Sequence, residues 1–278
     1  MTDRLAEHWQ LAEALIEPCR QASKAIIDIY REDATEVSIK ADSTPVTEAD
    51  HRSQDILLDH LRVLTPELPV LSEEGDLPSF EDRRQWQRYW LIDPLDGTRE
   101  FIHRTGEFTI NIALIDEGVP VLGVLAVPLE HAIYMGVPGY RAACYRRDSI
   151  DRIAASPLTP DAVRVLSGSR HFSGALADCV KKLEQEFGAV ASIKAGSALK
   201  FCRLAEGRGD IYPRFARCCE WDTAAGQALL EAAGGKVVDL QFNPLRYNSK
   251  KSLVSPHFYA VADSTVRWEA ILNPGNGN

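Results

Sequence analysis

Two aspartates at the end of an apolar run are the residues of this sequence best suited to chemistry. The run 89–92 predicts a buried strand that stops at Pro94, and Asp93 and Asp96 stand at its end with Leu95 between them. Carboxylates three residues apart across a tight turn can converge on one point, together with the carbonyl of Leu95. Such clustered oxygens suit a hard cation such as Mg²⁺, which also binds phosphate groups. A polar turn with only local hydrogen bonds is the alternative interpretation.

The next two residues add features suited to binding an anion at the same turn. Gly97 lets backbone amides approach an anion closely, and Thr98 adds a hydroxyl group. The turn therefore predicts a place where a cation and a phosphate meet.

Other carboxylates stand where predicted strands end or predicted helices begin. Glu73 and Glu74 follow a predicted strand over residues 68–71, where adjacent glutamates are commonly solvated. Asp222 lies in the first turn of a predicted helix over 222–233, where an acidic side chain also favours the helix dipole. Each of these carboxylates, taken alone, therefore allows a purely structural interpretation.

Two helix starts carry polar groups with the same double interpretation. Asp50 stands three residues after Thr47, which fits a capping box, but a helix start also gathers anions and their metals. Gly196, Ser197 and Lys200 open another predicted helix as a candidate anion cradle, although capping alone would explain them.

The elements that must position these residues fall into two halves. In the first half, apolar periodicity predicts a helix over 4–30 that Pro18 kinks or divides, and Thr47 begins a second helix. Apolar runs then predict successive strands, two of them joined by a hairpin at Glu117-Gly118, over 37–40, 68–71, 89–92, 108–116, 119–127, 132–137 and 141–145. This order indicates an α+β half with an antiparallel sheet.

The second half changes to an alternation of strands and helices, which favours an α/β arrangement. The expected strands cover 163–166, 190–194, 210–212, 236–240 and 258–262, and the expected helices cover 175–187, 198–206, 222–233 and 265–272. A polar stretch with prolines over 146–162 separates the halves and predicts two domains, 1–155 and 156–278.

Composition narrows the class of protein. The 278 residues are 45% hydrophobic and 26% charged, as in a globular protein with a sizeable core, and no apolar run is long enough to span a membrane. A formal charge of −9 argues against a broad nucleic-acid surface. The six cysteines show no metal-binding spacing, and the start lacks a secretory pattern, so we expect reduced thiols in a cytoplasmic protein.

Taken together, these segments resemble the inositol-monophosphatase family of Mg²⁺-dependent, lithium-sensitive phosphatases. The resemblance covers residues 40 to 240 and rests on elements in the family's order and spacing: residues 45–50, 73–74, 93–98 and 221–226. It implies a fold of alternating α and β layers with a metal site between the two halves.

Within the family, the segments 40–47, 90–98, 196–207 and 212–214 are most similar to the 3′(2′),5′-bisphosphate nucleotidases. That similarity implies the substrate 3′-phosphoadenosine 5′-phosphate, which is cleaved to AMP and phosphate during sulfate assimilation. Inositol-cleaving relatives place an acidic side chain where this chain has Arg214, and an arginine suits a second phosphate better than a polyol.

The resemblance also assigns residues to the substrate. Arg170 and His171 are alternatives at one position, and the segment 217–220, with Cys218 and Cys219, departs from the relatives. The residues expected to contact substrate are Glu73, Leu95, Asp96, Gly97, Thr98, His171, Ser197, Lys200, Arg214 and Asp222.

The metal assignment implied by the family has two or three Mg²⁺ ions. One ion is held by Glu73, Asp93 and the Leu95 carbonyl, a second by Asp93, Asp96 and Asp222, and a weaker third lies near Glu73 and Asp50. This arrangement is a two-metal clamp for an in-line displacement by an activated water. Asp50 and Thr98 are the expected catalytic residues that position and deprotonate the water, and the amides of Gly97 and Thr98 steady the phosphate.

Three other functions stay open on the sequence. They are an inositol or sugar monophosphate phosphatase with the same metal site, a non-catalytic regulator on the same scaffold, and a general anion- or metal-binding protein. The expected partner is a small-molecule substrate, with neither nucleic acid nor an integral membrane segment. A monomer and a homodimer are both compatible with the sequence, and so is peripheral attachment to the inner membrane.

Overall fold

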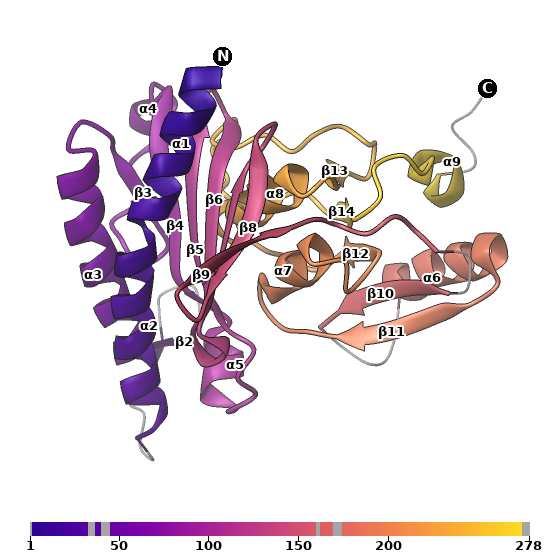
Figure 1. Ribbon diagram of the computed structural model, residues 1–278, viewed down its shortest axis with the longest axis horizontal. Helices are drawn as coiled ribbons and strands as arrows, with labels where there is room; N and C mark the ends of the chain where they lie inside the picture. The colour runs from indigo at the N-terminus through magenta and orange to yellow at the C-terminus, as the bar shows by residue number, and fades with distance from the viewer. Residues whose placement is uncertain (1, 33–36, 40–44, 160–161, 169–173, 274–278) are drawn as a thin grey trace.

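The chain forms five alternating layers of helices and sheets. The computed structural model describes residues 2–32, 37–39, 45–159, 162–168 and 174–273. Helices α1 to α3 form the outer layer at the left of Figure 1, and a seven-stranded sheet follows. Helices α7 and α8 separate this sheet from a five-stranded sheet, whose far face carries α6 and α9. The predicted layered fold is confirmed.

The first layer contains three helices, α1 (Thr2–Ala14), α2 (Ile16–Tyr30) and α3 (Glu48–Leu64). The predicted division of the first helix is confirmed, but it falls at Leu15 rather than at Pro18. Pro18 lies in the first turn of α2, where a missing backbone N–H interrupts no helical hydrogen bond.

The seven-stranded sheet has the order β3-β4-β5-β6-β7-β8-β9. Only β3 and β4 are parallel, and the other neighbours are antiparallel. The strands are β3 (Val70–Ser72), β4 (Arg88–Asp96), β5 (Thr109–Asp116), β6 (Val119–Val127), β7 (Ala132–Val137), β8 (Arg141–Arg146) and β9 (Ser149–Ile153). Strand β9 was not predicted, because its exposed polar residues resemble a linker, although they form the sheet's edge.

The end of β4 differs from the prediction. The strand does not stop at Pro94 but continues to Asp96, with a register shift between the pairs Asp93–Asn111 and Asp96–Thr109. Proline is tolerated at such an irregularity because no ladder N–H is needed there. The two aspartates therefore stand on either side of a bulge rather than in a turn after the strand.

The five-stranded sheet has the order β11-β10-β12-β14-β13, with β10 parallel to both β11 and β12 and the remaining pairs antiparallel. Its strands are β10 (Val163–Ser167), β11 (Val190–Lys194), β12 (Ile211–Arg214), β13 (Lys236–Asp239) and β14 (Phe258–Val261). Its helices are α6 (Gly174–Phe187), α7 (Leu199–Ala205), α8 (Ala224–Ala232) and α9 (Trp268–Leu272). The helix predicted from residue 222 begins later, because a 3₁₀ turn, η2 (Glu220–Asp222), precedes it.

Short elements complete the chain. Strands β1 (Val37–Ile39) and β2 (Pro45–Thr47) form a separate antiparallel pair, and α4 (Phe80–Arg83) precedes the central strand. Helix α5 (Thr98–Ile102) follows β4, and the 3₁₀ turn η1 (Pro128–Glu130) connects β6 to β7.

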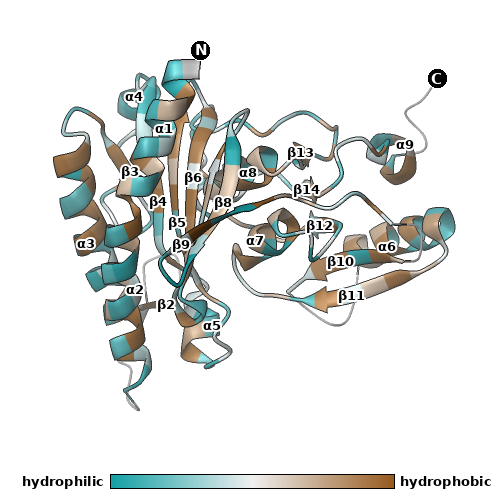
Figure 2. Cartoon of the chain, viewed as in Figure 1, coloured by the Kyte–Doolittle hydropathy of each residue, from teal (hydrophilic) through white to brown (hydrophobic). Residues whose placement is uncertain are grey.

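Three hydrophobic cores lie between the layers, and Figure 2 shows hydrophobic residues along the strands of both sheets. Strand β4 supplies two cores, because Trp90 and Ile92 face the outer helices while Tyr89 and Leu91 face α7 and α8. The core between this sheet and helices α7 and α8 contains residues from both halves of the chain. The domain boundary expected near residue 155 stays a prediction.

Glycines bring helix α8 against the seven-stranded sheet. A Cβ on Gly123 would lie 2.2 Å from the Ala225 carbonyl oxygen, and one on Gly136 would lie 2.4 Å from the Leu229 Cα. Any larger residue would push α8 away from β6 and β7, and η2, which immediately precedes α8, would move with it.

Among the described residues, no helix is both long and apolar enough to cross a membrane.

Candidate active site

Two parallel strands bring the first pair of carboxylates together. Glu73 directly follows β3, and its amide donates to the Ile92 carbonyl of β4 at 3.2 Å. Asp93 is the next residue of β4. Because neighbouring parallel strands end at the same edge of a sheet, the two side chains become neighbours.

Asp222 joins this pair from the second half of the chain. Turn η2 carries it, and its Oδ2 accepts a hydrogen bond from the Cys219 amide at 2.8 Å. One carboxylate oxygen each of Glu73, Asp93 and Asp222 lies within 4.8 Å of the others. The structure thus assembles three of the predicted metal ligands.

The electrostatics of this cluster fit a cation. Asp93 is buried, and its Oδ2 has no hydrogen-bond partner among the described residues. Burial raises the pKa of Asp93 well above its usual range, and neighbouring carboxylates raise it further, in the order Glu73, Asp96, Asp222 and Asp50. Burial also raises the pKa of Asp222. Buried like charges are costly without a counter-ion, and a divalent cation bound by their oxygens would remove that cost.

Asp96 lies beside the cluster but faces helix α7. Its Oδ2 accepts from the Ala198 amide at 2.6 Å and from Asn111 Nδ2 at 3.4 Å. Its charge still helps to raise the pKa of Asp222, so the two carboxylates are near each other. The assignment of Asp96 to a second ion stays a prediction.

Leu95 places both of its backbone polar groups inside the site. Its amide donates to Asp93 Oδ1 at 3.0 Å, which orients that carboxylate. Its carbonyl oxygen lies 3.5 Å from the Thr98 hydroxyl oxygen. Leu95 thus contacts Asp93 through its amide and Thr98 through its carbonyl, and the assignment of this carbonyl as a metal ligand stays a prediction.

The capping box predicted at residue 47 exists and forms part of the site. The amide and the hydroxyl of Thr47 donate to Asp50 Oδ2 at 2.8 and 2.7 Å. The other oxygen of Asp50, Oδ1, accepts from the Thr98 hydroxyl at 3.2 Å. The structural and functional interpretations of Asp50 are therefore compatible, because each uses a different oxygen.

Gly97 is required by the backbone between Asp96 and Thr98. Its φ is +97°, a left-handed conformation that side chains disfavour, and a Cβ would lie 3.2 Å from the Glu107 carbonyl oxygen. This conformation starts α5 abruptly, so that Thr98 turns back toward Asp50.

A cavity of about 140 Å³ adjoins the carboxylates and contains most of the other predicted residues. Its lining includes Asp96, Ser197, Lys200, Arg214 and Asp222. It is smaller than the roughly 300 Å³ or more of a pocket for a whole ligand, so it suits one group of a larger molecule. His171 and Arg170 lie outside the described residues.

Lys200 is more deeply buried than a surface phosphate ligand would be. Its Nζ donates to the Ala195 carbonyl at 3.1 Å and lies 5.0 Å from the centre of the Tyr212 ring. Burial lowers its pKa to about 8, and the charge of Arg214 contributes while that of Asp96 opposes the shift. Lys200 thus supplies a charge that is sensitive to pH beside Asp96.

Arg214 and Ser197 line the same cavity from different elements. Arg214 ends β12, and one of its terminal nitrogens donates to the Arg217 carbonyl at 3.0 Å. Its buried Nε has no partner among the described residues. Ser197, at φ +42°, accepts from the Leu199 amide at 3.3 Å. Arg214 therefore retains donor capacity near the carboxylates.

The comparisons with known proteins agree with this geometry. The model of the inositol monophosphatase family matches residues 8–269. The chain belongs to this family. It is 46% identical over 245 residues to the 3′(2′),5′-bisphosphate nucleotidase CysQ of Escherichia coli O6:H1, covering 86% of this chain and 94% of that protein.

Further relatives agree with that family. The nucleotidase CysQ of Haemophilus influenzae is 35% identical over 91% of this chain and 93% of its own length. The crystal structure of CysQ from Bacteroides thetaiotaomicron has a TM-score of 0.78 and 36% identity, covering 91% of this chain and 97% of that one.

This member of the inositol monophosphatase family also has supporting residues that the sequence analysis missed. On α3, the Ser53 hydroxyl donates to the Pro94 carbonyl at 2.7 Å, and Gln54 donates to the Glu74 carbonyl at 2.8 Å. Both share a helix face with Asp50, so their spacing was an available signal. They hold the bulge of β4 and the segment after β3 in place.

Two buried polar residues outside α3 were missed as well. Asn111 interrupts an apolar strand and contacts Asp96, and a polar residue in such a run is itself a signal. Glu220, two residues before Asp222, accepts from the Asn248 amide at 2.8 Å. Asn248 in turn donates to the Arg83 carbonyl at 2.6 Å, which ties η2 to α4.

Proposed function

We propose that this chain is a Mg²⁺-dependent phosphatase that removes the 3′-phosphate of 3′-phosphoadenosine 5′-phosphate, giving AMP and phosphate. The observation that carries the proposal is the buried cluster of Glu73, Asp93 and Asp222, whose like charges a cation would neutralise. The choice of substrate is supported by the relatives named as 3′(2′),5′-bisphosphate nucleotidases. A role in sulfate assimilation is what similarity to that group implies.

Mg²⁺ fits the donor set, because hard cations bind carboxylate and carbonyl oxygens. Glu73, Asp93 and Asp222 would hold it, with Asp96 and the Leu95 carbonyl as further ligands from the end of β4. When bound, Mg²⁺ stabilises negative charge on phosphate oxygens and lowers the pKa of water. We expect two or three ions.

Thr98 and Asp50 would position and deprotonate the attacking water. Because the Thr98 hydroxyl donates to Asp50, its oxygen lone pairs can accept a hydrogen bond from water. As the water oxygen bonds to phosphorus and the bond from phosphorus to the ribose O3′ breaks, the water proton would pass to Thr98 while the hydroxyl proton of Thr98 passes to Asp50. The departing O3′ would take a proton from a solvent water. Thr47 holds Asp50 in the required orientation, and the amides at Gly97 and Thr98 would steady the phosphate.

The cavity beside the cluster would hold the second phosphate. Arg214 can form paired charge-assisted hydrogen bonds with phosphate oxygens, and Lys200 adds a charge on the same side. Ser197 adds a hydroxyl at the start of α7. An inositol or sugar monophosphate has no second phosphate for these groups, so the monophosphate alternative leaves Arg214 without a role.

The test compares 3′-phosphoadenosine 5′-phosphate with inositol 1-phosphate as substrates, measuring phosphate release with Mg²⁺, in the presence and absence of lithium. We expect a lithium-inhibited preference for the nucleotide that Arg214→Gln removes and that Arg217→Gln, at an exposed neighbour, leaves intact. Preference for the inositol ester would retain the metal cluster but overturn the role of Arg214. Release from neither substrate would favour a non-catalytic regulator.

A cytoplasmic location, and either a monomer or a homodimer, also belong to this proposal. Both follow from the sequence-based expectations for a small-molecule enzyme of this family. Cell fractionation and light scattering of the purified protein would test them.

A further inference from the structure

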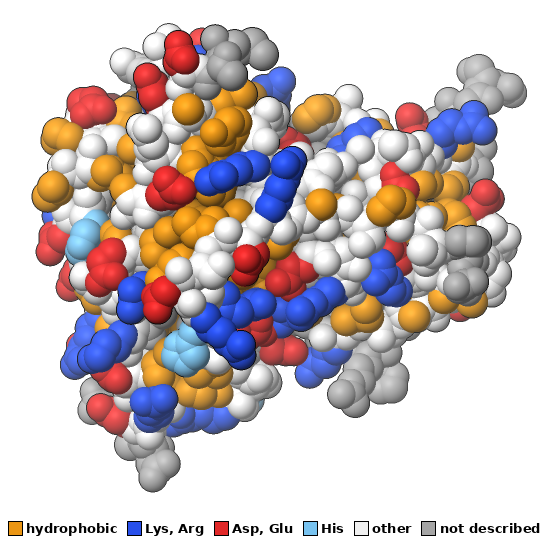
Figure 3. Space-filling view, in the orientation of Figure 1, with side chains coloured by type: hydrophobic (Ala, Val, Ile, Leu, Met, Phe, Trp, Pro, Cys, Tyr) orange, Lys and Arg blue, Asp and Glu red, His pale blue; other side chains and the backbone are white. Residues whose placement is uncertain are grey.

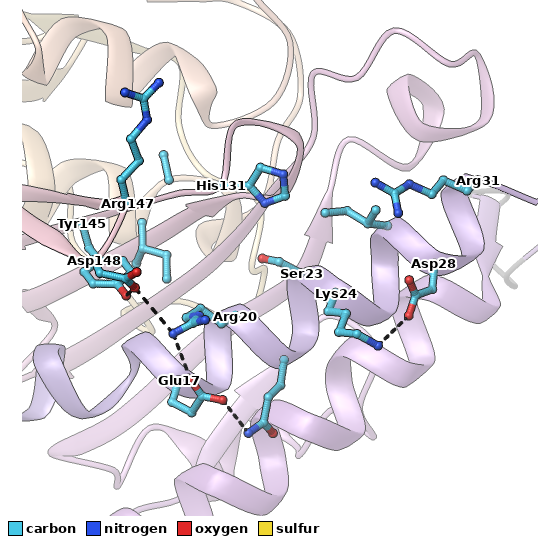
Figure 4. A pocket seen from close by; sticks show the side chains of 14 residues that line it. Glu17, Arg20, Ser23, Lys24, Asp28, Arg31, His131, Tyr145, Arg147 and Asp148 are labelled. Carbon is cyan, nitrogen blue, oxygen red and sulfur yellow. Dashed lines mark hydrogen bonds and ion pairs between the residues drawn. The ribbon is translucent and has the colours of Figure 1, made fainter.

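A second cleft lies between helix α2 and the strands β7 and β8, and it shares no residue with the cavity beside the carboxylates. Its volume is about 490 Å³, which is in the range of small-molecule sites. Its floor is apolar, because Ile27, Ala132 and Ile133 are buried there and the half-buried Tyr145 lies beside them. Figure 4 shows this cleft with the charged side chains around it.

Basic side chains around the cleft differ in how they are paired. Arg20 lies 3.7 Å from Glu17 and 4.0 Å from Asp148, and Lys24 lies 3.0 Å from Asp28. In Figure 3, basic, acidic and hydrophobic side chains intermix at the lower left, the side on which Figure 1 places α2.

Arg31, His131 and Arg147 are the exceptions to this pairing. Within the part of the chain that the structure describes, no hydrogen bond or ion pair is made by their side chains. Figure 4 places Arg31 and His131 at the cleft with Ser23, whereas Arg147 points away from them. Arg31 belongs to the helix wall and His131 to the opposite wall after η1. Donors from two walls therefore face one space over an apolar floor.

The backbone of the sheet-side wall is unusual at three lining residues. His131, Arg147 and Asp148 have φ of +49°, +53° and +59°, values that residues with side chains seldom adopt. A two-residue hairpin such as Arg147-Asp148 normally contains Asn-Gly at these positions. Strained backbone gathers at ligand sites, where the surrounding structure maintains it.

We propose that this cleft binds a small organic phosphate. The apolar body of the ligand lies on Ile27 and Ile133, and its phosphate accepts hydrogen bonds from Arg31, His131 and the Ser23 hydroxyl. A phosphate fits better than a carboxylate because its three terminal oxygens can face donors on both walls at once. This site is separate from the proposed catalytic site and does not depend on it.

The test measures binding of phenylphosphonate by calorimetry, with EDTA present to keep metal out of the carboxylate cluster. The carbon–phosphorus bond of this probe resists a phosphatase, and phosphate and phenol represent its two halves. We expect the probe to bind more tightly than either half, and the double variant Arg31→Gln/His131→Asn to bind it at least about tenfold more weakly. Asn is chosen because it tolerates the left-handed backbone at 131.

Two control variants locate the bound probe. Arg62→Gln, at an exposed arginine of α3 that lies 3.8 Å from Asp59, should leave binding unchanged. Arg214→Gln should also leave it unchanged, because that side chain lines the other cavity. Loss of binding in Arg214→Gln with normal binding in the double variant would place the probe in the active-site cavity and overturn the proposal.

Two further results have a defined meaning. Absence of measurable binding to the native chain would also overturn the proposal. If thermal unfolding shows that the double variant is destabilised, the exposed single change Arg31→Gln replaces it, and unchanged affinity in that variant would overturn the proposal as well.

Discussion

The two ends of helix α7 meet charged groups in opposite ways. At its N-terminal end, the Ala198 amide holds Asp96 beside Glu73, Asp93 and Asp222, a group of carboxylates. At its C-terminal end, Arg203 lies between Glu130 and Glu206, with 3.2 Å to the former and 3.6 Å to the latter. One end gathers like charges, and the other pairs opposite ones.

This difference separates a site from a structural contact. Burial and like charges raise the pKa of Asp93, and a divalent cation bound by the cluster would offset this electrostatic cost. In the network of Arg203, each acid has a basic neighbour, and Arg146 adds a contact to Glu206 at 3.5 Å. Uncompensated buried charge is therefore the more informative signal of function.

The largest effect is expected from Asp93→Asn. Activity should fall by about a thousandfold or more, because several kcal/mol of charge stabilisation by the cation would be lost. In EDTA the same variant should be more stable than the native chain, because it removes the carboxylate that its neighbours oppose. Turnover with Mg²⁺ and thermal unfolding in EDTA test the two statements. Near-native Mg²⁺-dependent turnover would contradict the metal assignment.

The next effect is expected from Thr98→Val. Turnover should fall by about a hundredfold or more, because the water would lose its link to Asp50. Mg²⁺ affinity should stay near that of the native chain, since this side chain is not in the carboxylate cluster. Turnover and Mg²⁺ titration of the same preparation separate these quantities, with Thr105→Val, at an exposed residue after α5, as the matched control.

Arg203→Met tests the paired end of α7. The free energy of unfolding should fall by about 1–3 kcal/mol, because the largely buried Glu206 loses one of its basic neighbours. The affinity for Mg²⁺ should not change, because the carboxylate cluster stays complete. Chemical denaturation and Mg²⁺ titration provide the measurements. A large loss of Mg²⁺ affinity with native stability would reverse the distinction between the two ends.

The smallest effect is the pH dependence contributed by Lys200. Its pKa is lowered to about 8, so its positive charge is lost as pH rises through 8, and KM for the bisphosphate should rise several-fold between pH 7 and 9. The stability of the chain changes in the other direction from substrate binding. Between pH 8 and 10.5 the lysine is protonated in the unfolded chain but largely neutral in the folded chain, so the unfolded chain binds more protons. The free energy of unfolding contributed by this residue therefore rises with pH over that range. Lys200→Arg should remove both dependences, since arginine remains charged.

Local rules accounted for much of the fold and for the types of residue in the site. The capping box at Thr47 and the hairpin at Glu117-Gly118 formed as predicted, because each depends on a few adjacent residues. The prediction that β4 ends at Pro94 was wrong, because pairing with β5 continues beyond Pro94 through a bulge. Strand β9 was missed, because its edge position makes it as polar as a linker.

The site shows the same limit of local reasoning. Its carboxylates were recognisable as candidates, but so were structural explanations for each of them. Asp50 has both a capping role and a role in the site, and only its contact with Thr98 reveals the role in the site. Residues that merely hold others, such as Ser53 and Asn111, have a role only through partners far away in the chain.

The sequence by itself therefore determined most of the element types, the abrupt Gly97 turn and the chemistry available at each position. Only the tertiary structure decided that Glu73, Asp93 and Asp222 meet while Asp96 turns to the Ala198 amide. It also decided that Lys200 is buried, which sets its lowered pKa. The physical reason is the distance along the chain over which each interaction acts. Capping, turns and periodicity act over a few residues, whereas these contacts depend on how α8 and its preceding turn pack against the seven-stranded sheet.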